Sequence, residues 1–457
     1  MGGLLIRGGR VIDPSSGVDE NMNILIRDGK IMEMRPVRGF YSNSNMIRDQ
    51  GYANRIKGEP DTNNPDTNNI EEIDASGKVI TPGLIDMHVH LREPGFEYKE
   101  DIKTGSEAAG SGGFTSIACM PNTLPVNDNR SVTDFILSRG KERGIVNIYP
   151  IAAITKGLKG EELSEIGELS EAGVIAISND GGVMVKGGVM RRALEYARMF
   201  NLLVISHCED TNLSAGGVMN EGFVSTELGL RGIPNVSEEI IVARDIALAE
   251  LTGERLHIAH VSTAGSVRMI REAKGRGLNI SCEVAPHHFT LSDEAVRGFD
   301  TNTKVNPPLR SEEDLDAIKE GLKDGIIEVI ATDHAPHNIY EKEVEYNYAP
   351  FGIVGLETGL SLTLRLVHNG ILSLMEAISK LTINPAKIMR LDTKGVLKIG
   401  GDADITIIDI NREIIVDVSR FKSKSRNSPF NGWRLKGCVE KTIVGGKVVF
   451  SDTTSQN

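Results

Sequence analysis

The chain has 457 residues, of which 40% are hydrophobic and 25% charged, a composition typical of a globular protein. Its length exceeds that of a usual single domain, so we expect one large barrel with a smaller second domain. With 51 basic and 63 acidic side chains, the formal net charge is −12, which argues against nucleic acid or an anionic membrane as the main partner. An anionic substrate would therefore need a locally basic pocket.

Cysteine usage and hydropathy indicate a cytoplasmic protein. The four cysteines are far apart, form no C-x-x-C pair and lie mostly within apolar runs, as reduced buried cysteines do; they are Cys119, Cys208, Cys282 and Cys438. No apolar stretch approaches the roughly 20 residues of a membrane span. Residues 1–7 lack the layout of a signal peptide.

Both ends of the chain consist of short strand patterns. Residues 4–6, 10–12, 23–26 and 30–34 form one set, with Asp28 and Gly29 as a hairpin turn, and residues 70–80 return to this pattern. Residues 40–69 are rich in Asn, Asp, Ser and Gly and are typical of a flexible insertion without a catalytic role. Residues 403–408, 413–416, 441–444 and 447–450 form the second set. We predict that residues 1–80 and 392–457 together build a small β-sandwich domain flanking a barrel of residues 81–391.

Between the two ends, apolar runs alternate with amphipathic helical stretches. Eight candidate strands end near residues 90, 120, 152, 178, 207, 260, 284 and 332. Helical patterns cover residues 163–172, 189–200, 237–252, 266–276 and 374–391. Eight such units predict a (β/α)₈ barrel of the TIM type, in which catalytic residues gather at the C-terminal ends of the strands. A doubly wound open sheet is the alternative, but no G-x-G-x-x-G follows an early strand.

Side chains of the kind that bind metals follow five of these runs. They are His88, His90, Asp180, His207, His260 and Asp333. His88 and His90 are two apart in a strand and therefore project from one face. Four imidazoles and two carboxylates suit zinc or a similar divalent ion. Six ligands exceed the need of one tetrahedral site, so a binuclear centre sharing Asp180 would use them all.

Other histidines in the same region have weaker patterns. His257 lies three residues before His260 and would face the other side of its strand, as a packing or surface residue. His334 follows Asp333 and is at best a neighbour of the ligands. His287 and His288 end the seventh strand, and their role is left open. His368 beside Asn369 is typical of a solvated residue.

Six segments together resemble a dihydroorotase of the amidohydrolase superfamily: residues 88–95 (HVHLREPG), 120–123 (MPNT), 206–210 (SHCED), 306–310 (NPPLR), 331–337 (ATDHAPH) and 350–358 (PFGIVGLET). The resemblance covers residues 78–409. It implies a metal-bearing barrel, an accessory β domain and the reversible interconversion of N-carbamoyl-L-aspartate and L-dihydroorotate in pyrimidine (UMP) synthesis. His-x-His alone would mark only the superfamily.

One position departs from many relatives. Hydantoinases, allantoinases and some dihydroorotases carry a carboxylated lysine at the end of the fourth strand, where this chain has Ser178. Asp180 is similar to the bridging aspartate of the branch that lacks the lysine. Members of that branch hold one metal ion or two, so the number of ions stays open.

The implied chemistry fits these residues. A zinc-bound water is a nucleophile at neutral pH, and Asp333 is the expected catalytic group that accepts its proton and returns it to the ring nitrogen. Arg92 offers a fork of donors suited to a carboxylate. By resemblance, the other substrate-binding residues are Asn122, His337, Asn306, Pro350 and Phe351. The competing interpretations are a surface ion pair for Arg92 and turn formation for the two asparagines.

Two other functions remain as alternatives. One is a related cyclic amidase, such as an allantoinase or hydantoinase, which Arg92 and residues 306–308 disfavour. The other is a catalytically silent barrel that assembles with aspartate transcarbamoylase, which the complete ligand set disfavours. The resemblance also allows a homo-oligomer, an active enzyme associated with aspartate transcarbamoylase, and a mobile lid at residues 338–350.

Overall fold

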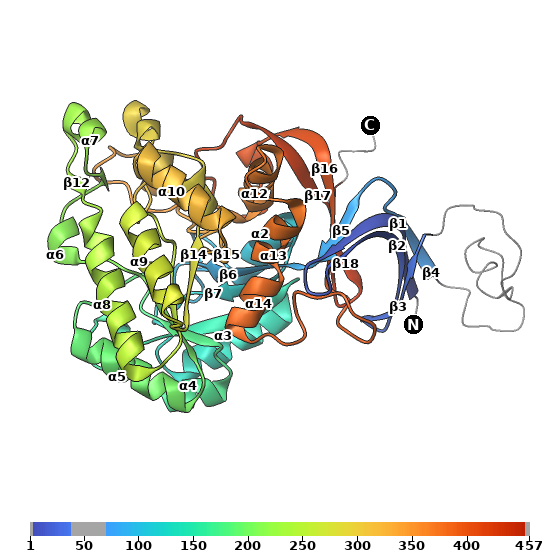
Figure 1. Ribbon diagram of the computed structural model, residues 1–457, viewed down its shortest axis with the longest axis horizontal. Helices are drawn as coiled ribbons and strands as arrows, with labels where there is room; N and C mark the ends of the chain where they lie inside the picture. The colour runs from blue at the N-terminus through green and yellow to red at the C-terminus, as the bar shows by residue number, and fades with distance from the viewer. Residues whose placement is uncertain (1–2, 38–69, 453–457) are drawn as a thin grey trace, which may run out of the picture.

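The structure is a computed structural model that describes residues 3–37 and 70–452. The predicted insertion at residues 40–69 lies outside the described residues. Two large sheets dominate the rest, a barrel on one side and a separate sheet beside it (Figure 1). Among the described residues, no helix has both the length and the apolar character needed to cross a bilayer.

Eight parallel strands form a nearly closed barrel, as predicted. In chain order they are β6 (Leu84–Val89), β7 (Phe114–Cys119), β8 (Asn147–Ala153), β9 (Ala176–Ser178), β10 (Leu203–Ser206), β13 (Leu256–Ile258), β14 (Ile280–Val284) and β15 (Val329–Ile330). Closure comes from a parallel bridge between Val89 and His334, with the His90 amide donating to His334 O at 2.9 Å. Every residue of β6 and β7 is buried, because helices cover the outer face of a parallel barrel, and so the apolar residues of these strands do not alternate with exposed polar ones.

Helices follow the strands and form the outer layer of the barrel (Figure 1). They are α2 (Ile102–Ser111), α3 (Arg130–Arg143), α4 (Ile166–Ala172), α5 (Gly187–Met199), α8 (Val236–Thr252), α9 (Ala264–Gly275), α10 (Glu312–Lys323), α12 (Leu356–His368), α13 (Leu374–Leu381) and α14 (Ile383–Met389). The helical stretch predicted over residues 374–391 consists of two helices, α13 and α14, that meet at Thr382. Pro385 explains the break: its ring would clash with the carbonyl four residues earlier in a continuous helix.

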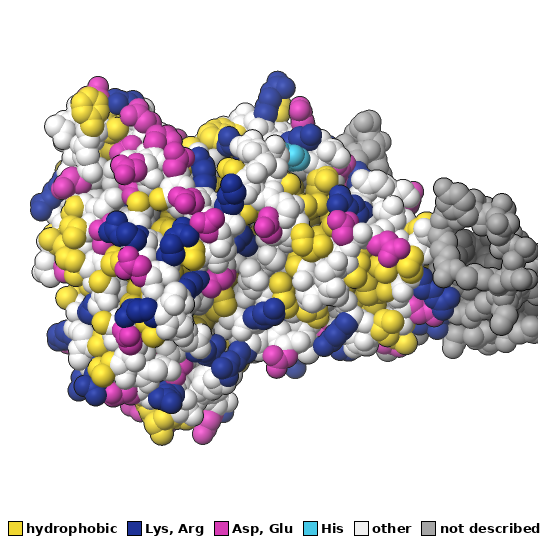
Figure 2. All heavy atoms as spheres, viewed as in Figure 1, with side chains coloured by type: hydrophobic (Ala, Val, Ile, Leu, Met, Phe, Trp, Pro, Cys, Tyr) yellow, Lys and Arg dark blue, Asp and Glu magenta, His cyan; other side chains and the backbone are white. Residues whose placement is uncertain are grey.

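Shorter elements decorate the loops that follow the strands. They are α6 (Thr211–Ser214), α7 (Phe223–Leu228), α11 (Ile339–Lys342), β11 (Met219–Asn220) and β12 (Gly232–Ile233). On the face shown in Figure 2, basic and acidic side chains are intermixed over the helices. Arg271 and Asp324, for example, form an ion pair at 2.8 Å between α9 and the end of α10.

The second sheet contains strands from both ends of the chain. They are β1 (Gly3–Asp13), β2 (Val18–Arg27), β3 (Lys30–Pro36), β4 (Ile70–Asp74), β5 (Val79–Pro82), β16 (Ile405–Ile415), β17 (Arg434–Val444) and β18 (Lys447–Ser451). β5 pairs in parallel with β1 and antiparallel with β16. The prediction that the two ends form one separate β unit is therefore confirmed.

Two strands of this sheet were each predicted as two shorter ones. β1 continues through an irregularity between Ile6 and Gly9, where Gly8 has a φ of 72°. β16 likewise continues across a register shift between Asp409 and Glu413.

Gly83 is the sole residue between β5 and β6, and a Cβ there would lie 2.0 Å from Thr115 Oγ1. A single residue therefore links strand β5 of the second sheet to β6, the first strand of the barrel.

Candidate metal centre and substrate pocket

The six predicted ligands gather at one end of the barrel. His88 lies in β6 and His90 just after it, while the others follow β9, β10, β13 and β15. Five of the six are buried, and His207 is nearly so. Because the C-terminal ends of parallel strands meet at one rim, residues far apart in the sequence lie together here.

Distances within this group are short. His88 Nε2 lies 3.2 Å from Asp180 Oδ2, and His90 Nε2 lies 3.2 Å from Asp333 Oδ1. Two sets of three each have ligand atoms within 4.8 Å of one another: His88, Asp180 and His260, and His88, His90 and Asp333. Asp180 is close to four imidazoles, because its carboxylate also lies 3.7 Å from His90, 3.6 Å from His207 and 3.4 Å from His260.

This donor set fits a divalent metal. His88 Nε2 is buried and has no hydrogen-bond partner among the described residues. His207 Nδ1 faces His260 Nε2 at 2.9 Å, so two imidazole nitrogens meet beside one carboxylate. Burial raises the pKa of Asp333, but the hydrogen bond to His90 and the charge of His88 outweigh it and hold that pKa below its usual range. An ionised carboxylate among imidazole nitrogens matches the preference of zinc-like ions.

A glutamate that sequence reasoning missed pairs with Nδ1 of His88, the ring nitrogen that is not next to Asp180. Glu283 on β14 places Oε1 2.6 Å from His88 Nδ1 and Oε2 3.3 Å from His257 Nε2. His257 is fully buried, so it is a packing residue rather than a surface one. Burial raises the pKa of Glu283, but the charge of His88 and the hydrogen bond to His257 lower it to about 2. An acidic residue inside an apolar strand was the available signal.

A second missed glutamate links the metal ligands to the pocket. Glu209 Oε2 lies 3.1 Å from His207 Nε2 and accepts a hydrogen bond from Asn306 Nδ2 at 2.9 Å. Burial raises the pKa of Glu209, but the hydrogen bond and charge of His207 lower it to about 2. The carboxylate is thus ionised and holds one nitrogen of His207 away from the other ligands.

Neighbouring side chains fix the remaining ligands. Asn122 Oδ1 lies 2.8 Å from His90 Nδ1. Gly181, with a φ of 87°, packs against Asn122, whose Cβ would lie 2.4 Å from a Cβ at that position. At the position of the absent lysine, Ser178 Oγ accepts from the Asp180 amide at 3.0 Å. Ser178 therefore holds the backbone of Asp180 in place.

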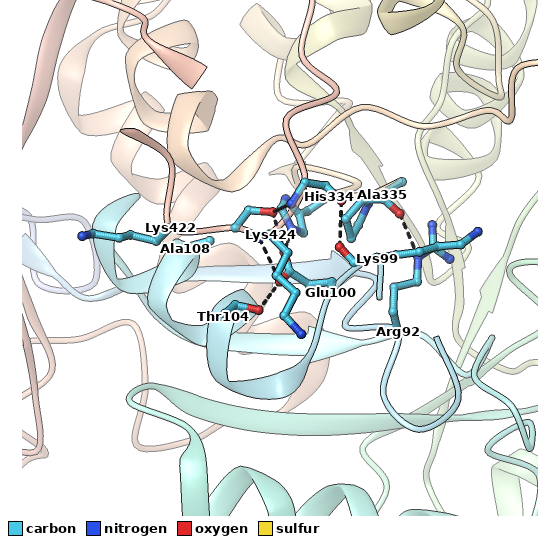
Figure 3. A network of polar contacts seen from close by, with 12 residues as sticks. Arg92, Lys99, Glu100, Thr104, Ala108, His334, Ala335, Lys422 and Lys424 are labelled. Atoms are coloured by element: carbon cyan, nitrogen blue, oxygen red, sulfur yellow. Dashed lines mark hydrogen bonds and ion pairs between the residues drawn. The ribbon is translucent and has the colours of Figure 1, made fainter. Parts of the chain in front are cut away.

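The histidines left open by sequence lie beside the centre. His287 and His288 are buried in a 3-10 turn after β14, and His288 Nε2 lies 2.9 Å from Pro307 O. His334 Nε2 lies 3.4 Å from Glu100 Oε2 (Figure 3). Its Nδ1 accepts from the Gly355 amide. These contacts connect the ligand-bearing loops to the surrounding backbone.

A cavity of about 400 Å³ opens onto the ligands. Five of the predicted ligands line it, and so do all six predicted substrate residues: Arg92, Asn122, Asn306, His337, Pro350 and Phe351. A larger hollow of about 930 Å³ lies against the second sheet, and none of the described residues that line it belongs to a metal-type cluster. The smaller cavity is therefore the candidate site.

Arg92 stands in this cavity with most of its guanidinium unused. Its Nε donates to Pro336 O at 3.3 Å, its only hydrogen bond among residues 3–37 and 70–452 (Figure 3). Neither Nη group has an ion-pair partner in those ranges, so the predicted surface ion pair is absent from them. Arg92 has a φ of 63°, and two ligands, His260 and Asp333, also have positive φ. Left-handed backbone in such residues is costly and is typical of functional sites.

His337 is neutral and tied to the pocket wall. Burial and then the charges of Arg92 and Lys99 lower its pKa to about 2. Its Nε2 lies 2.8 Å from Phe351 O and its Nδ1 3.4 Å from Lys99 Nζ. Because the ring nitrogen next to the Phe351 carbonyl is the protonated one, the tautomer is defined.

Two buried lysines anchor the segment that follows. Lys342 Nζ donates to Pro350 O at 2.7 Å and Thr301 O at 3.0 Å. Lys304 Nζ donates to Tyr346 O at 2.9 Å and lies 4.8 Å from the centre of the Phe351 ring. Each Nζ therefore binds a backbone carbonyl within residues 338–350.

A (β/α)₈ barrel with these residues at its strand ends defines a metal-dependent amidohydrolase. Residues 77–266 match the dihydro-orotase-like family and residues 243–450 match the amidohydrolase family. The chain is 55% identical to the dihydroorotase of Geobacter metallireducens and 57% identical to that of Pelotomaculum thermopropionicum. Each alignment spans 98% of this chain and 99% of the relative. The chain belongs to the dihydroorotase family.

Solved structures agree on the fold. The L-hydantoinase (dihydropyrimidinase) of Arthrobacter aurescens has a TM-score of 0.82 at 24% identity, covering 99% of this chain and 96% of that one. A dihydropyrimidinase of Brevibacillus agri has a TM-score of 0.79 at 22% identity, covering 98% of this chain and 95% of that one. At this level of identity the likeness shows the fold alone, and the substrate has to be inferred from the residues of the pocket.

Proposed function

We propose that this enzyme interconverts N-carbamoyl-L-aspartate and L-dihydroorotate, a step of pyrimidine synthesis. The observation that carries the proposal is that one cavity holds both metal-type side chains and an Arg92 guanidinium with a single hydrogen bond to the described residues. The substrate has the matching parts, a carboxylate and a hydrolysable ring amide. A guanidinium fork suits the carboxylate, so the amide can lie against the ligand cluster.

We propose a zinc-like divalent ion held by His88, His90, Asp180, His207, His260 and Asp333, with Asp180 shared where two ions bind. When bound, such an ion polarises a carbonyl and makes water nucleophilic near neutral pH. Glu283 and Glu209 support this assignment, because each pairs with the outer nitrogen of a ligand histidine. Histidines that bind metals are held in this way.

Asp333 is the proposed proton carrier. Its carboxylate is held ionised, the state that a general base requires. In ring opening, the water oxygen forms a bond to the ring carbonyl carbon, and Asp333 takes the water proton. The carbon–nitrogen bond then breaks, and Asp333 returns the proton to the departing nitrogen. Ring closure follows the same steps in reverse.

The remaining pocket residues recognise the substrate. Arg92 and Asn122 are proposed to receive the carboxylate, and Asn306 the ureido part of the ring. His337 is proposed to line the carboxylate side of the pocket, because its N–H is directed to Phe351 O. Glu209 accepts from Asn306 Nδ2, which leaves Asn306 Oδ1 to accept a ring N–H. Pro350 and Phe351 form the apolar wall. The hydantoinase alternative has less support, because those substrates lack the carboxylate that Arg92 would bind.

Ring opening of L-dihydroorotate tests the proposal, followed by ultraviolet absorbance on chelator-stripped protein before and after zinc is added. Hydantoin and allantoin are run in parallel. Turnover of dihydroorotate that depends on zinc is expected. Turnover of hydantoin alone, or none with zinc bound, would contradict it. A cytoplasmic location, a homo-oligomer and association with aspartate transcarbamoylase stay predictions, and sedimentation with and without that enzyme tests the last two.

A further inference from the structure

A short extended segment between β16 and β17 crosses the rim of the barrel beside the candidate site. We call residues 422–427 the strap. Its side chains alternate: Ser423, Ser425 and Asn427 are buried, whereas Lys422 and Lys424 are exposed. Such a period of two is typical of an extended chain with one face against the protein. Figure 3 shows the strap beside Glu100 and His334.

The two serines fix the strap to the loop that follows β6. Ser423 Oγ donates to Glu100 Oε2, and the Lys424 amide donates to Glu100 Oε1 at 3.2 Å (Figure 3). Ser425 Oγ donates to Lys99 O at 2.7 Å. These bonds hold the strap in register along the loop and thereby set the position of its last residue, Asn427.

Asn427 binds both backbone segments on one side of the pocket. Its Nδ2 donates to Ala335 O and to Gly352 O, each at 3.0 Å. Its Oδ1 accepts from the His337 amide at 3.1 Å, and its carbonyl accepts from the Val354 amide at 3.0 Å. Both side-chain donors and the side-chain acceptor are thus used, and the residue is only 3% exposed.

These contacts lie next to residues that face the substrate. Ala335, His337 and Gly352 line the cavity, and His337 Nε2 pairs with Phe351 O. A Cβ on Gly352 would lie 2.6 Å from Ala335 O, so the two segments approach too closely for a side chain between them. The side-chain amide of Asn427 donates to both segments and so joins them.

We propose that Asn427 is a positioning residue for the carboxylate side of the substrate pocket. The inference rests on the function proposed above and adds a residue from the C-terminal part of the chain to the site. Asn427 acts through the backbone of residues 335–337 and 351–354, and it sets where the His337 ring and the Phe351 wall stand relative to Arg92. Its loss therefore affects substrate binding before it affects metal binding.

The test compares Asn427→Asp and Asn427→Ala with the wild type. Asp keeps an acceptor for the His337 amide, but its second carboxylate oxygen faces the carbonyl oxygens of Ala335 and Gly352. Ala removes all three side-chain hydrogen bonds and leaves room for a water molecule. Asn431→Asp is the matched control, because Asn431 is exposed and, within the described part of the chain, its side chain accepts only from the Val418 amide at 3.1 Å. Kinetics with L-dihydroorotate, calorimetric binding of orotate, zinc content and circular dichroism are measured for each.

For both Asn427 variants, KM and the orotate Kd are expected to rise about tenfold or more while kcat changes about threefold or less. Zinc content and the circular dichroism spectrum stay at wild-type values, and Asn431→Asp behaves as wild type. Unchanged KM and orotate Kd would overturn the inference. So would an equal loss of zinc and of kcat in Asn427→Ala, the milder variant. A wild-type protein that neither turns over dihydroorotate nor binds orotate would instead refute the proposed function.

Discussion

Replacing Arg92 with Met tests the carboxylate clamp directly. Met has a similar length and apolar bulk but no charge and no N–H donors. The substitution removes one known protein contact, the hydrogen bond from Nε to Pro336 O at 3.3 Å. Arg92 is partly buried at the edge of the cavity, so little of the surrounding packing depends on its charged end. The main loss is therefore the interaction with the ligand.

The expected size follows from the type of contact. Two Nη groups without partners among the described residues are available for one carboxylate, a bidentate pair in a partly desolvated cavity. Removing one partner from such a pair costs roughly 2–5 kcal/mol. A central value of about 3 kcal/mol corresponds to about 150-fold in KM for L-dihydroorotate. The value of kcat is expected to change far less, because the ligand cluster and Asp333 are untouched.

The assay measures kcat and KM for L-dihydroorotate and for 5,6-dihydrouracil, which lacks the carboxylate. Arg92→Met should reduce the preference for dihydroorotate, because only that substrate has the group that Arg92 binds. Arg92→Lys is the control, since it keeps the charge without the planar fork. Its KM for dihydroorotate is expected to lie between those of the wild type and Arg92→Met. An unchanged KM for dihydroorotate in Arg92→Met would refute the clamp. An equal loss for both substrates would show that Arg92 acts on the pocket as a whole.

Asp333→Asn is expected to lower kcat about 10²–10⁴-fold with metal content near that of the wild type; wild-type turnover would exclude the proton-carrier role. Glu283→Gln should weaken zinc binding about 10–100-fold in a chelator competition, because His88 loses an ionised partner, and an unchanged affinity would contradict this. Burial, and then the charge of Lys304, lowers the pKa of Lys342 from 10.5 to about 7. Between these values the unfolded chain binds more protons, so stability rises with pH. In Lys342→Met the rise in melting temperature from pH 7 to pH 9 should be smaller, and an equal rise would rule out this titration.

The ends of the barrel strands and the positions of the six candidate ligands follow from the sequence for one physical reason. A buried parallel strand is a run of apolar residues that stops where the chain meets solvent or a site. His207 directly follows such a stop, and Asp333 lies three residues after one. The predicted strand ends agree with the structure within two residues. Whether a strand continues or ends at a glycine was harder to predict, because an irregularity such as that near Gly8 and a true turn have similar residues.

Long-range partners were beyond the reach of the sequence. Glu283 meets His88 across 195 positions, and Asn306 meets Glu209 across 97. Periodicity indicates which face a residue occupies, but it does not indicate which residue of another strand it meets. Asn427 stands among serines and basic residues in a stretch typical of a polar loop. Its four hydrogen bonds depend on where two other loops place their carbonyls and amides.

The position of β5 between β1 and β16 has a consequence for synthesis on the ribosome. β5 is followed after one residue by the first barrel strand, yet one of its two neighbours lies more than 300 residues later; Lys78, just before β5, pairs with Asp409 at 2.5 Å. A nascent chain that has already formed the barrel still has an unpaired strand edge on β5, next to the start of the first barrel strand. Such edges bind other strands readily, so β16, which is synthesised more than 300 residues after β5, protects that edge from aggregation when it pairs.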